Sequence, residues 1–345
     1  MHQDWQDFLT TQGAQIQDGV VSQFGDAAAE RLATRDGTVL CDLGQFCTLR
    51  ASGEEAETFL QNLLSNDIRE VSDTRAQLSS LNTAKGRMLA TLFIWRASDD
   101  YLLQLPRVLC EPIRKKLNMY VLRAKVKITD ASDEIVTLGL SGVDAAEILR
   151  TRFGELPQSP LGVVNNESGN VIKVSDTRWQ INATPQNAQM LWTEFKAKAR
   201  PVGSGCWDWL NIRSGTPIIL PQTQEQFVAQ MANLDLINGV NFKKGCYPGQ
   251  EIVARTQYLG KLKRRMFLAH IDSDSATQAG DELFSADMEG QACGMLANVA
   301  AAPSGGYDVL AVLQTSSRET QPVHWKSPQG ATLQFLSLPY TLPSN

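Results

Sequence analysis

Histidine is scarce in this chain of 345 residues, and its three copies stand far apart, at His2, His270 and His324. A multi-histidine metal site or a histidine-based catalytic triad is therefore poorly supplied, and we expect no metal ligands. Long apolar runs are also missing, since none approaches the roughly eighteen residues needed to cross a bilayer. The N-terminal stretch is polar and acidic. We therefore expect neither secretion nor contact with a membrane.

Closely spaced cysteines are the next absence. The six cysteines form no CxxC pair and lie far apart, at Cys41, Cys47, Cys110, Cys206, Cys246 and Cys293. Zinc sites and iron–sulfur clusters usually bind through cysteines at short spacing, so a resident site of either kind is disfavoured. A reducing compartment, the cytoplasm, fits this cysteine usage best. The net charge of −5 and pI near 5.4 argue against a surface built to coat duplex DNA.

Hydrophobic periodicity predicts a mixed α+β fold. Ser52 to Glu55 has the form of a capping box, and the apolar spacing after it predicts a helix that closes near Asn66-Asp67. Other segments follow in a β-α-β-β-α-β order instead of strict alternation, which favours α+β layers over a doubly wound sheet. They are a hairpin over 88–95 and 101–105, a helix near 109–120, an edge strand at 125–128, a strand at 136–140, a helix near 143–152, strands at 171–174 and 179–183, and a helix from Pro185 whose apolar face is Ala188, Leu191, Trp192 and Phe195.

The pattern changes after residue 260, where short apolar runs are separated by Gly, Pro, Ser and Asp. Such spacing is typical of a small antiparallel barrel. We therefore expect an N-terminal helix and linker over 1–40 and an α+β region over 41–250. Within that region we expect two intertwined domains, with 70–132 inserted. The C-terminal barrel would cover 260–345.

One turn stands out for its chemistry. Asn241 and Phe242 end a strand-like stretch, Lys244 to Gly249 form a tight Gly/Pro turn, and Gln250 begins a helix. Cys246 would then precede a helix N-terminus, where the helix dipole and neighbouring lysines favour the reactive thiolate. A small buried hydrophobe is the alternative interpretation of this cysteine. Glu251 and Arg255, four residues apart, are equally explained as an ion pair on a helix surface.

The whole string from Phe242 to Gly260, FKKGCYPGQEIVARTQYLG, closely resembles the signature of the YgfZ-type folate-binding, tRNA-modifying proteins. The turn from Ala84 to Met88, AKGRM, is similar to another motif of that family. Further similarity covers 46–53, 226–234 and 338–340. The resemblance implies the three-domain fold of the aminomethyltransferase of the glycine cleavage system, with ferredoxin-like α+β layers and a C-terminal antiparallel barrel.

The same resemblance implies a folate, as tetrahydrofolate or a one-carbon derivative, in a central channel between domains. Phe46 and Trp207 match aromatic positions that contact it, because flat rings stack on one another, and Asn233 belongs to the same implied site. Without the resemblance, Phe46 and Trp207 would be interpreted as core residues. Arg213 departs from the family, which commonly has Glu there. The arginine side chain has no hydrogen-bond acceptor, so it cannot accept hydrogen bonds from a pterin as a carboxylate can. It would instead hold a carboxylate of the glutamyl tail or pair with an internal acid.

By resemblance, the chain would be a folate-binding accessory protein for iron–sulfur cluster assembly or repair and for tRNA modification. Cys246 and Lys244 would carry the chemistry, and the rest of the turn and helix would position them, namely Gly245, Tyr247, Gly249, Gln250, Glu251 and Arg255. Its partners would be folate and, transiently, iron–sulfur enzymes or assembly proteins. The alternatives are a folate-dependent aminomethyl or one-carbon transferase and a folate carrier without chemistry, so whether the chain is an enzyme stays open.

Two basic segments interrupt this acidic chain. Residues 107–127 hold seven Lys or Arg against Glu111, a local charge of +6, and residues 243–265 hold seven against Glu251, again +6. Each segment is either an anion site, for polyglutamyl folate, RNA or an acidic partner, or an ordinary solvated face. No RRM, KH or OB signature accompanies them, so direct reading of an RNA sequence is unsupported.

Overall fold

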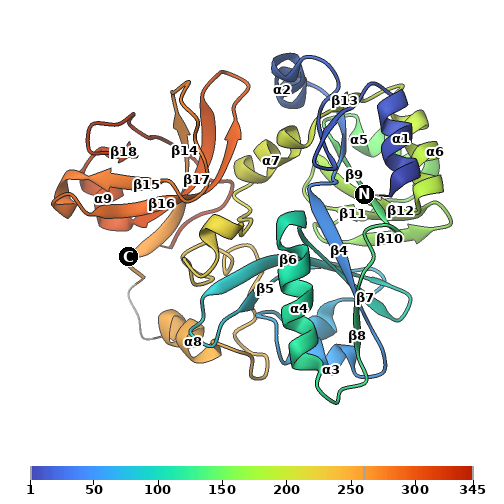
Figure 1. Cartoon of the computed structure of the whole chain (residues 1–345), viewed down its shortest axis with the longest axis horizontal. Helices are drawn as coiled ribbons and strands as arrows, with labels where there is room; N and C mark the ends of the chain where they lie inside the picture. The colour runs from blue at the N-terminus through green and yellow to red at the C-terminus, as the bar shows by residue number, and fades with distance from the viewer. Residues whose placement is uncertain (1, 259–261, 344–345) are drawn as a thin grey trace. The chain divides into compact units, whose positions relative to one another are not determined.

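A computed structural model describes residues 2–258 and 262–343 of the chain (Figure 1). The chain divides into two compact units. The first, called the N-terminal unit here, comprises Met1–Phe59, Ile68–Gln77 and Phe93–Trp207. The second, the C-terminal unit, comprises Leu60–Asp67, Leu78–Leu92 and Asp208–Asn345. The predicted α+β class is confirmed, and each unit is described below by itself.

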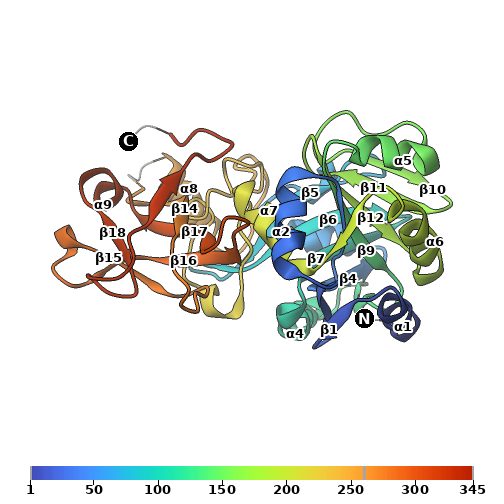
Figure 2. The same cartoon turned by 90° about the horizontal axis from the view of Figure 1, so that it is seen from above.

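A six-stranded sheet forms the centre of the N-terminal unit. All of its neighbouring strands are antiparallel except the β3–β13 pair, and their order is β10 (Val163–Asn166), β11 (Gly169–Lys173), β12 (Arg178–Ala183), β9 (Val136–Ser141), β3 (Val39–Asp42) and β13 (Arg200–Val202). Helices α1 (Gln3–Thr11), α5 (Ala145–Phe153) and α6 (Pro185–Phe195) lie beside it (Figure 2). The four predicted apolar residues of α6 are all buried, as its spacing requires.

The first forty residues contain more regular structure than one helix and a linker. After α1 come a hairpin of β1 (Gln15–Gln17) and β2 (Val20–Gln23), and then helix α2 (Ala27–Asp36). Local signals explain both elements. Asp18 and Gly19 have positive φ angles, which suit a tight hairpin turn. Asp26 accepts hydrogen bonds from the backbone N–H groups of Ala28 and Ala29, which caps the start of α2.

A five-stranded sheet has the order β5 (Gln77–Asn82), β6 (Met88–Ala97), β7 (Asp100–Pro106), β4 (Phe46–Ser52) and β8 (Lys127–Asp130). It confirms the predicted β6–β7 hairpin and the edge strand, and α4 (Cys110–Val121) matches the predicted helix. The helix expected to close near Asn66-Asp67 is shorter. It is α3 (Ala56–Gln61), because Ser65 leaves the helical path to donate its N–H to the carbonyl of Ser80.

The C-terminal unit contains a six-stranded antiparallel sheet, which confirms the predicted C-terminal β architecture. Its order is β18 (Val323–Trp325), β15 (Glu282–Ser285), β16 (Ala292–Ala301), β17 (Tyr307–Gln314), β14 (Arg264–Ile271) and β19 (Gln334–Leu336), with α9 (Thr315–Thr320) between β17 and β18. Helices α7 (Ser204–Arg213) and α8 (Gln250–Tyr258) precede it in the chain. The prediction of a strand that ends at Asn241-Phe242 is wrong, because that segment consists of turns and irregular backbone.

A buried carboxylate joins the first helix to the first strand of the large sheet in the N-terminal unit. Trp5, on α1, donates its indole N–H to Asp42 Oδ1 at 2.8 Å, and the N–H of Gly44 donates to Asp42 Oδ2 at 3.0 Å. Asp42 is only 2% exposed, and this burial raises its pKa to about 6. The fold therefore favours the protonated carboxyl group over the carboxylate.

We expect Asp42 to make the N-terminal unit less stable as the pH rises. Its folded pKa, about 6, lies above the ordinary 3.8, so its stabilising contribution is full below pH 4 and is lost as the pH passes 6. The loss is about 3 kcal/mol. Urea unfolding of the wild type and of Asp42→Asn between pH 4 and pH 7 measures it. The difference between the two proteins should change by that amount, and a difference that is flat with pH would contradict the assignment.

Candidate functional site

Two glycine turns that are far apart in the sequence meet in the C-terminal unit. Gly249 has a φ of +80° and Gly86 a φ of +69°, angles that favour glycine. A methyl group added at Gly249 would lie 2.4 Å from the Cα of Gly86 and 2.6 Å from the carbonyl oxygen of Thr83. The backbones therefore approach as closely as two glycines allow. The AKGRM turn and the cysteine-bearing turn form one structure.

Lys244 anchors the cysteine-bearing turn from within. The residue is only 6% exposed, and its ammonium group donates to the carbonyl oxygens of Gln61 at 2.6 Å, Leu64 at 2.5 Å and Asn66 at 3.1 Å. Gln61 is the last residue of α3, where a cation also complements the helix dipole. The ring of Tyr247 lies 5.0 Å from the same ammonium group. These hydrogen bonds attach the cysteine-bearing turn to the end of α3 and the residues after it.

Side-chain amides and burial fix the rest of the turn. Asn241 Oδ1 accepts hydrogen bonds from the backbone N–H groups of Lys243 and Lys244, at 2.8 and 3.1 Å. Gln250 Nε2 donates to the carbonyl of Lys244 at 3.3 Å. Tyr247 is 7% exposed, and burial raises its pKa to about 12, so it stays a neutral phenol at physiological pH. The turn is thus held at both of its ends.

Cys246 projects from this fixed turn and is exposed, whereas Cys41, Cys206 and Cys293 are buried. The alternative of a small buried hydrophobe is therefore wrong for Cys246. Helix α8 begins at Gln250, four residues beyond the cysteine, so the thiol does not lie in the first turn of the helix. Glu251 and Arg255 are both exposed, and no ion pair joins them in the part of the chain that the structure describes.

Asn233 lies inside the C-terminal unit, with a φ of +57° and no exposed surface. Its Nδ2 donates to the carbonyl of Met266 at 2.7 Å and lies 3.4 Å from the hydroxyl of Tyr340. That hydroxyl donates to the carbonyl of Gly215 at 2.8 Å. The amide of Asn233 therefore links three segments of the unit, and a ligand would have to exchange these bonds to reach it.

Arg213 pairs with an internal acid, one of the two roles expected for it. Its Nη1 lies 3.6 Å from Asp308 Oδ2. Asp308 is 5% exposed and also binds the indole N–H of Trp209 at 2.8 Å and Nδ1 of His270 at 2.9 Å. His270 and Asp308 face each other across β14 and β17. The sequence carried no signal for this cluster, because its members come from three separate segments.

The two aromatic residues expected at the folate site belong to the N-terminal unit and differ in accessibility. Trp207 is only 3% exposed, with the guanidinium of Arg178 4.4 Å from its ring and Gly139 so close that a methyl group there would lie 2.6 Å from the ring. Phe46 is partly exposed and lines a pocket. Asp42, which the sequence did not single out for a site, lines it too, as does Arg107, the first residue of the basic segment over 107–127.

The two basic segments differ once folded. In the segment over 243–265, Lys244 is buried, and Arg265 pairs with Asp235 at 2.8 Å. Lys261 and the end of the signature at Leu259-Gly260 lie outside the described residues. The arrangement therefore has less exposed charge than the sequence suggested.

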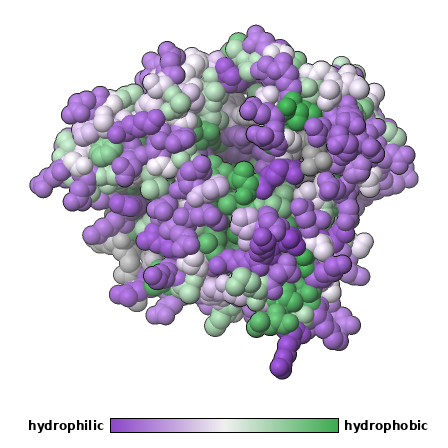
Figure 3. Space-filling view, viewed as in Figure 1, coloured by the Kyte–Doolittle hydropathy of each residue, from purple (hydrophilic) through white to green (hydrophobic). Residues whose placement is uncertain are grey.

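The segment over 107–127 keeps more of its charge at the surface. Arg114 and Lys115 share Glu111, and Lys125 pairs with Glu54, while Lys116, Arg123 and Lys127 form no ion pair in the part of the chain that the structure describes. Met119 and Leu122 are 75% and 89% exposed beside them. Figure 3 shows hydrophobic residues gathered at the lower end of this face, where α4 ends in Figure 1.

Within the described ranges, no three His, Cys, Asp or Glu side chains come together as metal ligands would. Among the same residues, no helix is both long and apolar enough to span a membrane.

Comparison with known proteins gives a consistent result. The family model described as the GCVT N-terminal domain matches residues 8–244. A protein named tRNA-modifying protein YgfZ, from Colwellia psychrerythraea, is 31% identical over 72% of this chain and 77% of its own length. Its namesake from Escherichia coli O157:H7 is 29% identical over 88% of this chain and 93% of its own length.

Among solved structures, the glycine cleavage system aminomethyltransferase T from Bartonella henselae matches over 96% of both chains, with a TM-score of 0.79. Its sequence identity is 17%, so the likeness establishes the fold alone.

We predict that Gly249→Ala destabilises the C-terminal unit. The added methyl group meets the backbone of Gly86, and the positive φ angle disfavours alanine, so the loss should be about 2–4 kcal/mol. Gly245→Ala is the matched control in the same turn, because a methyl group there meets nothing within 4 Å. Chemical unfolding of both variants measures the effect. Equal stability of the two would show that Gly86 and Gly249 do not touch.

Lys244→Met should be costly, whereas Lys243→Met should be nearly neutral. Methionine has a similar shape but cannot donate to the three carbonyls of 61, 64 and 66, and leaving them unsatisfied costs about 2–4 kcal/mol. Lys243 is exposed, so its replacement should change stability by less than about 0.5 kcal/mol. Urea midpoints give the comparison. If Lys244→Met unfolded like the wild type, the anchoring role would be refuted.

Proposed function

Because this chain belongs to the GCVT N-terminal domain family and is similar to proteins named tRNA-modifying protein YgfZ, we propose that it is a folate-binding accessory protein for tRNA modification. In this proposal it supports the assembly or repair of iron–sulfur enzymes, including those that thiolate tRNA, and it acts in the cytoplasm. The observation that carries the proposal is the exposed Cys246 on a turn held from within by Lys244.

The geometry of the turn supports a chemical role for Cys246. A thiol kept for packing would be buried, as Cys41, Cys206 and Cys293 are. Here a buried ammonium, two glycines in close contact and a buried tyrosine hold the backbone while the thiol projects outward. Such a rigid mounting suits a group that must meet a reacting partner in one geometry. Lys244 acts in this proposal as a positioning residue.

The residues of the N-terminal unit fit a folate in part. The pocket lined by Phe46 has a volume of only about 20 Å³, too small for a pterin ring to enter, but Phe46 offers an aromatic ring for stacking and Arg107 a guanidinium for a carboxylate. Arg107 Nε and Nη2 donate to the carbonyls of Gly44 and Phe46, which sets the direction of the guanidinium. When bound, the folate would supply a one-carbon carrier. Trp207 does not line this pocket and is covered by Arg178 and Gly139, so we assign it a supporting role within the N-terminal unit instead of direct contact with the folate.

Iron–sulfur enzymes or assembly proteins are the proposed partners, met transiently. The end of α4 supports such contacts, because it combines exposed apolar side chains with cations. Methionine and arginine are enriched in protein interfaces, whereas lysine and scattered aliphatic residues offer little to read an RNA sequence. We therefore propose that tRNA modification depends on this chain through partner enzymes.

A folate-dependent aminomethyl transferase is the second candidate, and the fold shared with aminomethyltransferase T favours it. Arg213 speaks against it. This side chain is an arginine engaged with Asp308, not a carboxylate able to accept hydrogen bonds from a pterin. A purified-protein assay for tetrahydrofolate-dependent aminomethyl transfer decides the matter. Turnover that survives Cys246→Ser would replace our proposal with this one.

We predict that Cys246→Ser abolishes support of tRNA thiolation while leaving the fold intact, because an exposed side chain contributes little to stability. Thiolated nucleosides would be measured in cells that depend on this chain, by mass spectrometry of digested tRNA. Cys293→Ala serves as the control for loss of a buried thiol, and it should sustain normal thiolation. Undiminished thiolation with Cys246→Ser would refute a chemical role for this cysteine.

A further inference from the structure

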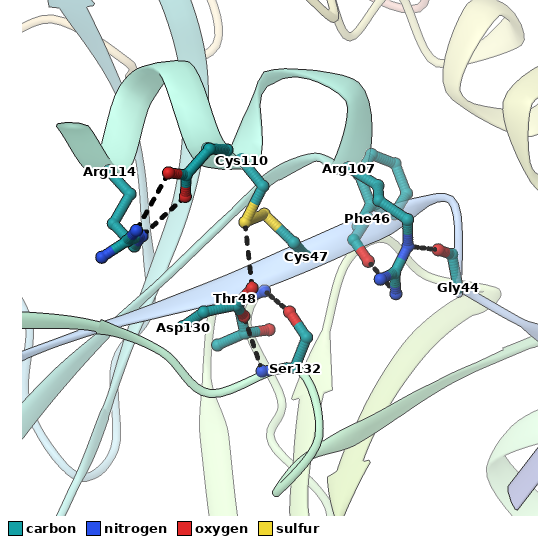
Figure 4. Close-up of a disulfide and its surroundings, with 10 residues drawn as sticks. Gly44, Phe46, Cys47, Thr48, Arg107, Cys110, Arg114, Asp130 and Ser132 are labelled. Atoms are coloured by element: carbon teal, nitrogen blue, oxygen red, sulfur yellow. Dashed lines mark hydrogen bonds and ion pairs between the residues drawn. A yellow bond between two sulfur atoms is a disulfide. The ribbon is translucent and has the colours of Figure 1, made fainter. Parts of the chain in front are cut away.

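The N-terminal unit contains a disulfide that sequence spacing did not suggest. Cys47 lies on β4, and Cys110 is the first residue of α4, 63 positions further along the chain. Their Cα atoms are 6.1 Å apart, inside the range that a disulfide spans without moving the backbone. Figure 4 shows the bond joining the start of α4 to the strand beneath it. It acts as a covalent clip between these two elements.

The two cysteines have different surroundings. Cys47 is paired with Leu105 in the β4–β7 ladder and is 2% exposed, so a rigid sheet holds it. Cys110 is 8% exposed and follows the short turn η2 (Arg107–Leu109), where Val108 is 63% exposed. Opening that turn would uncover Cys110 without breaking the β4–β7 ladder that holds Cys47.

Cys110 is also the more reactive partner by position. A thiolate at the first residue of a twelve-residue helix is stabilised by the helix dipole. Asp130 opposes this effect, because its Oδ2 lies 3.7 Å from the sulfur. The carboxylate is held there by the N–H of Ser132, which donates to Oδ1 at 2.9 Å (Figure 4). Cys110 thus has one group that favours attack and another that restrains it.

We propose that Cys47 and Cys110 are a reversible thiol–disulfide site, whose substrates are an external disulfide in one direction and a dithiol or thiol pair in the other. In the reducing cytoplasm, the location proposed above, protein disulfides are usually transient or redox-sensing and seldom permanent cross-links. The site requires nothing from Cys246. It therefore adds a second sulfur chemistry to the chain.

The exchange balances without any further reactant. The thiolate of Cys110 attacks one sulfur of the external disulfide, forms a mixed disulfide and releases one thiolate. Cys47, after losing its proton to solvent, attacks the sulfur of Cys110 and releases the second thiolate. The protein loses two electrons and two protons, and the external disulfide gains the electrons and becomes two thiols. Reduction runs through the same steps in reverse.

Oxidation has a structural consequence because of what the two elements carry. Strand β4 begins with Phe46, which lines the pocket, and Arg107 donates hydrogen bonds to the carbonyls of Gly44 and Phe46 just before α4 (Figure 4). Helix α4 carries Met119 and the cations near its end. The disulfide therefore holds Phe46, which lines the pocket, close to the start of α4. Its reduction allows the start of α4 to open.

Native protein equilibrated against graded ratios of glutathione disulfide to glutathione provides the test. Thiols are then alkylated under denaturing conditions and counted by mass. We expect a reversible change between four and six alkylated cysteines, with peptide mapping assigning the change to Cys47 and Cys110. Six thiols at every ratio, or a bond reduced only after unfolding, would overturn the proposal.

A second measurement follows the helix. Hydrogen exchange of the α4 amides should be at least about tenfold faster in the reduced protein than in the oxidised one. The first unfolding transition should also fall by about 5–10 °C on reduction, because a long loop is no longer closed. Cys47→Ala and Cys110→Ala should each match the reduced wild type at every ratio. Cys293→Ala should keep the redox response, and loss of that response in this control would assign the effect to another cysteine and refute the site.

Cys246→Ser separates this inference from the proposed function. The variant should lose tRNA thiolation but keep the change from oxidised to reduced at Cys47 and Cys110, with one thiol fewer in each count. Normal thiolation with Cys246→Ser would refute the chemical role of Cys246. Loss of the redox change in the same variant would instead refute the thiol–disulfide site at Cys47 and Cys110.

Discussion

The buried ammonium of Lys244 is the interaction on which the candidate site depends. A charge removed from water is costly unless several dipoles replace its hydration, and here the carbonyls of Gln61, Leu64 and Asn66 do so. Those carbonyls belong to the end of α3 and the turn after it, so one side chain joins two distant segments of the chain. Because Lys244 lies only two residues from Cys246, this anchor also fixes the backbone that carries the exposed thiol.

Close backbone contact adds a second constraint of a different kind. Gly86 and Gly249 leave no room for a side chain, and both have φ angles that favour glycine. Steric exclusion and a charge–dipole interaction thus act on opposite ends of the same turn. Neither contributes chemistry directly, yet both restrict where the sulfur can lie. A reactive group on such a support pays little conformational entropy when it meets a partner.

The fold shared with an aminomethyltransferase does not by itself determine chemistry, and the C-terminal unit shows why. Arg213 is drawn to Asp308, whose carboxylate also binds Trp209 and His270. These hydrogen bonds and the nearby guanidinium offset the cost of burying the Asp308 carboxylate. Arg213 is therefore part of a local network. The chemistry of this unit must be argued from these side chains and not from the fold.

The sequence by itself determined the local structure. Periodicity located the β6–β7 hairpin, helix α6 with its four buried side chains and every strand of the C-terminal sheet except β15, because burial on one face repeats every two or 3.6 residues. It also identified the turn around Cys246, whose Gly and Pro content is a local signal. It overextended α3, because the pairing of Ser65 with Ser80 depends on a segment fifteen residues away.

Only the tertiary structure decided which distant groups meet. The contact of Gly86 with Gly249, the three carbonyls around Lys244, the cluster at Asp308 and the bond between Cys47 and Cys110 all join segments that are separate in the sequence. No local pattern encodes such a meeting, since each partner has an ordinary neighbourhood of its own. Burial then fixes the outcome, because a charge or a polar group removed from water must find its partner wherever the folded chain places one.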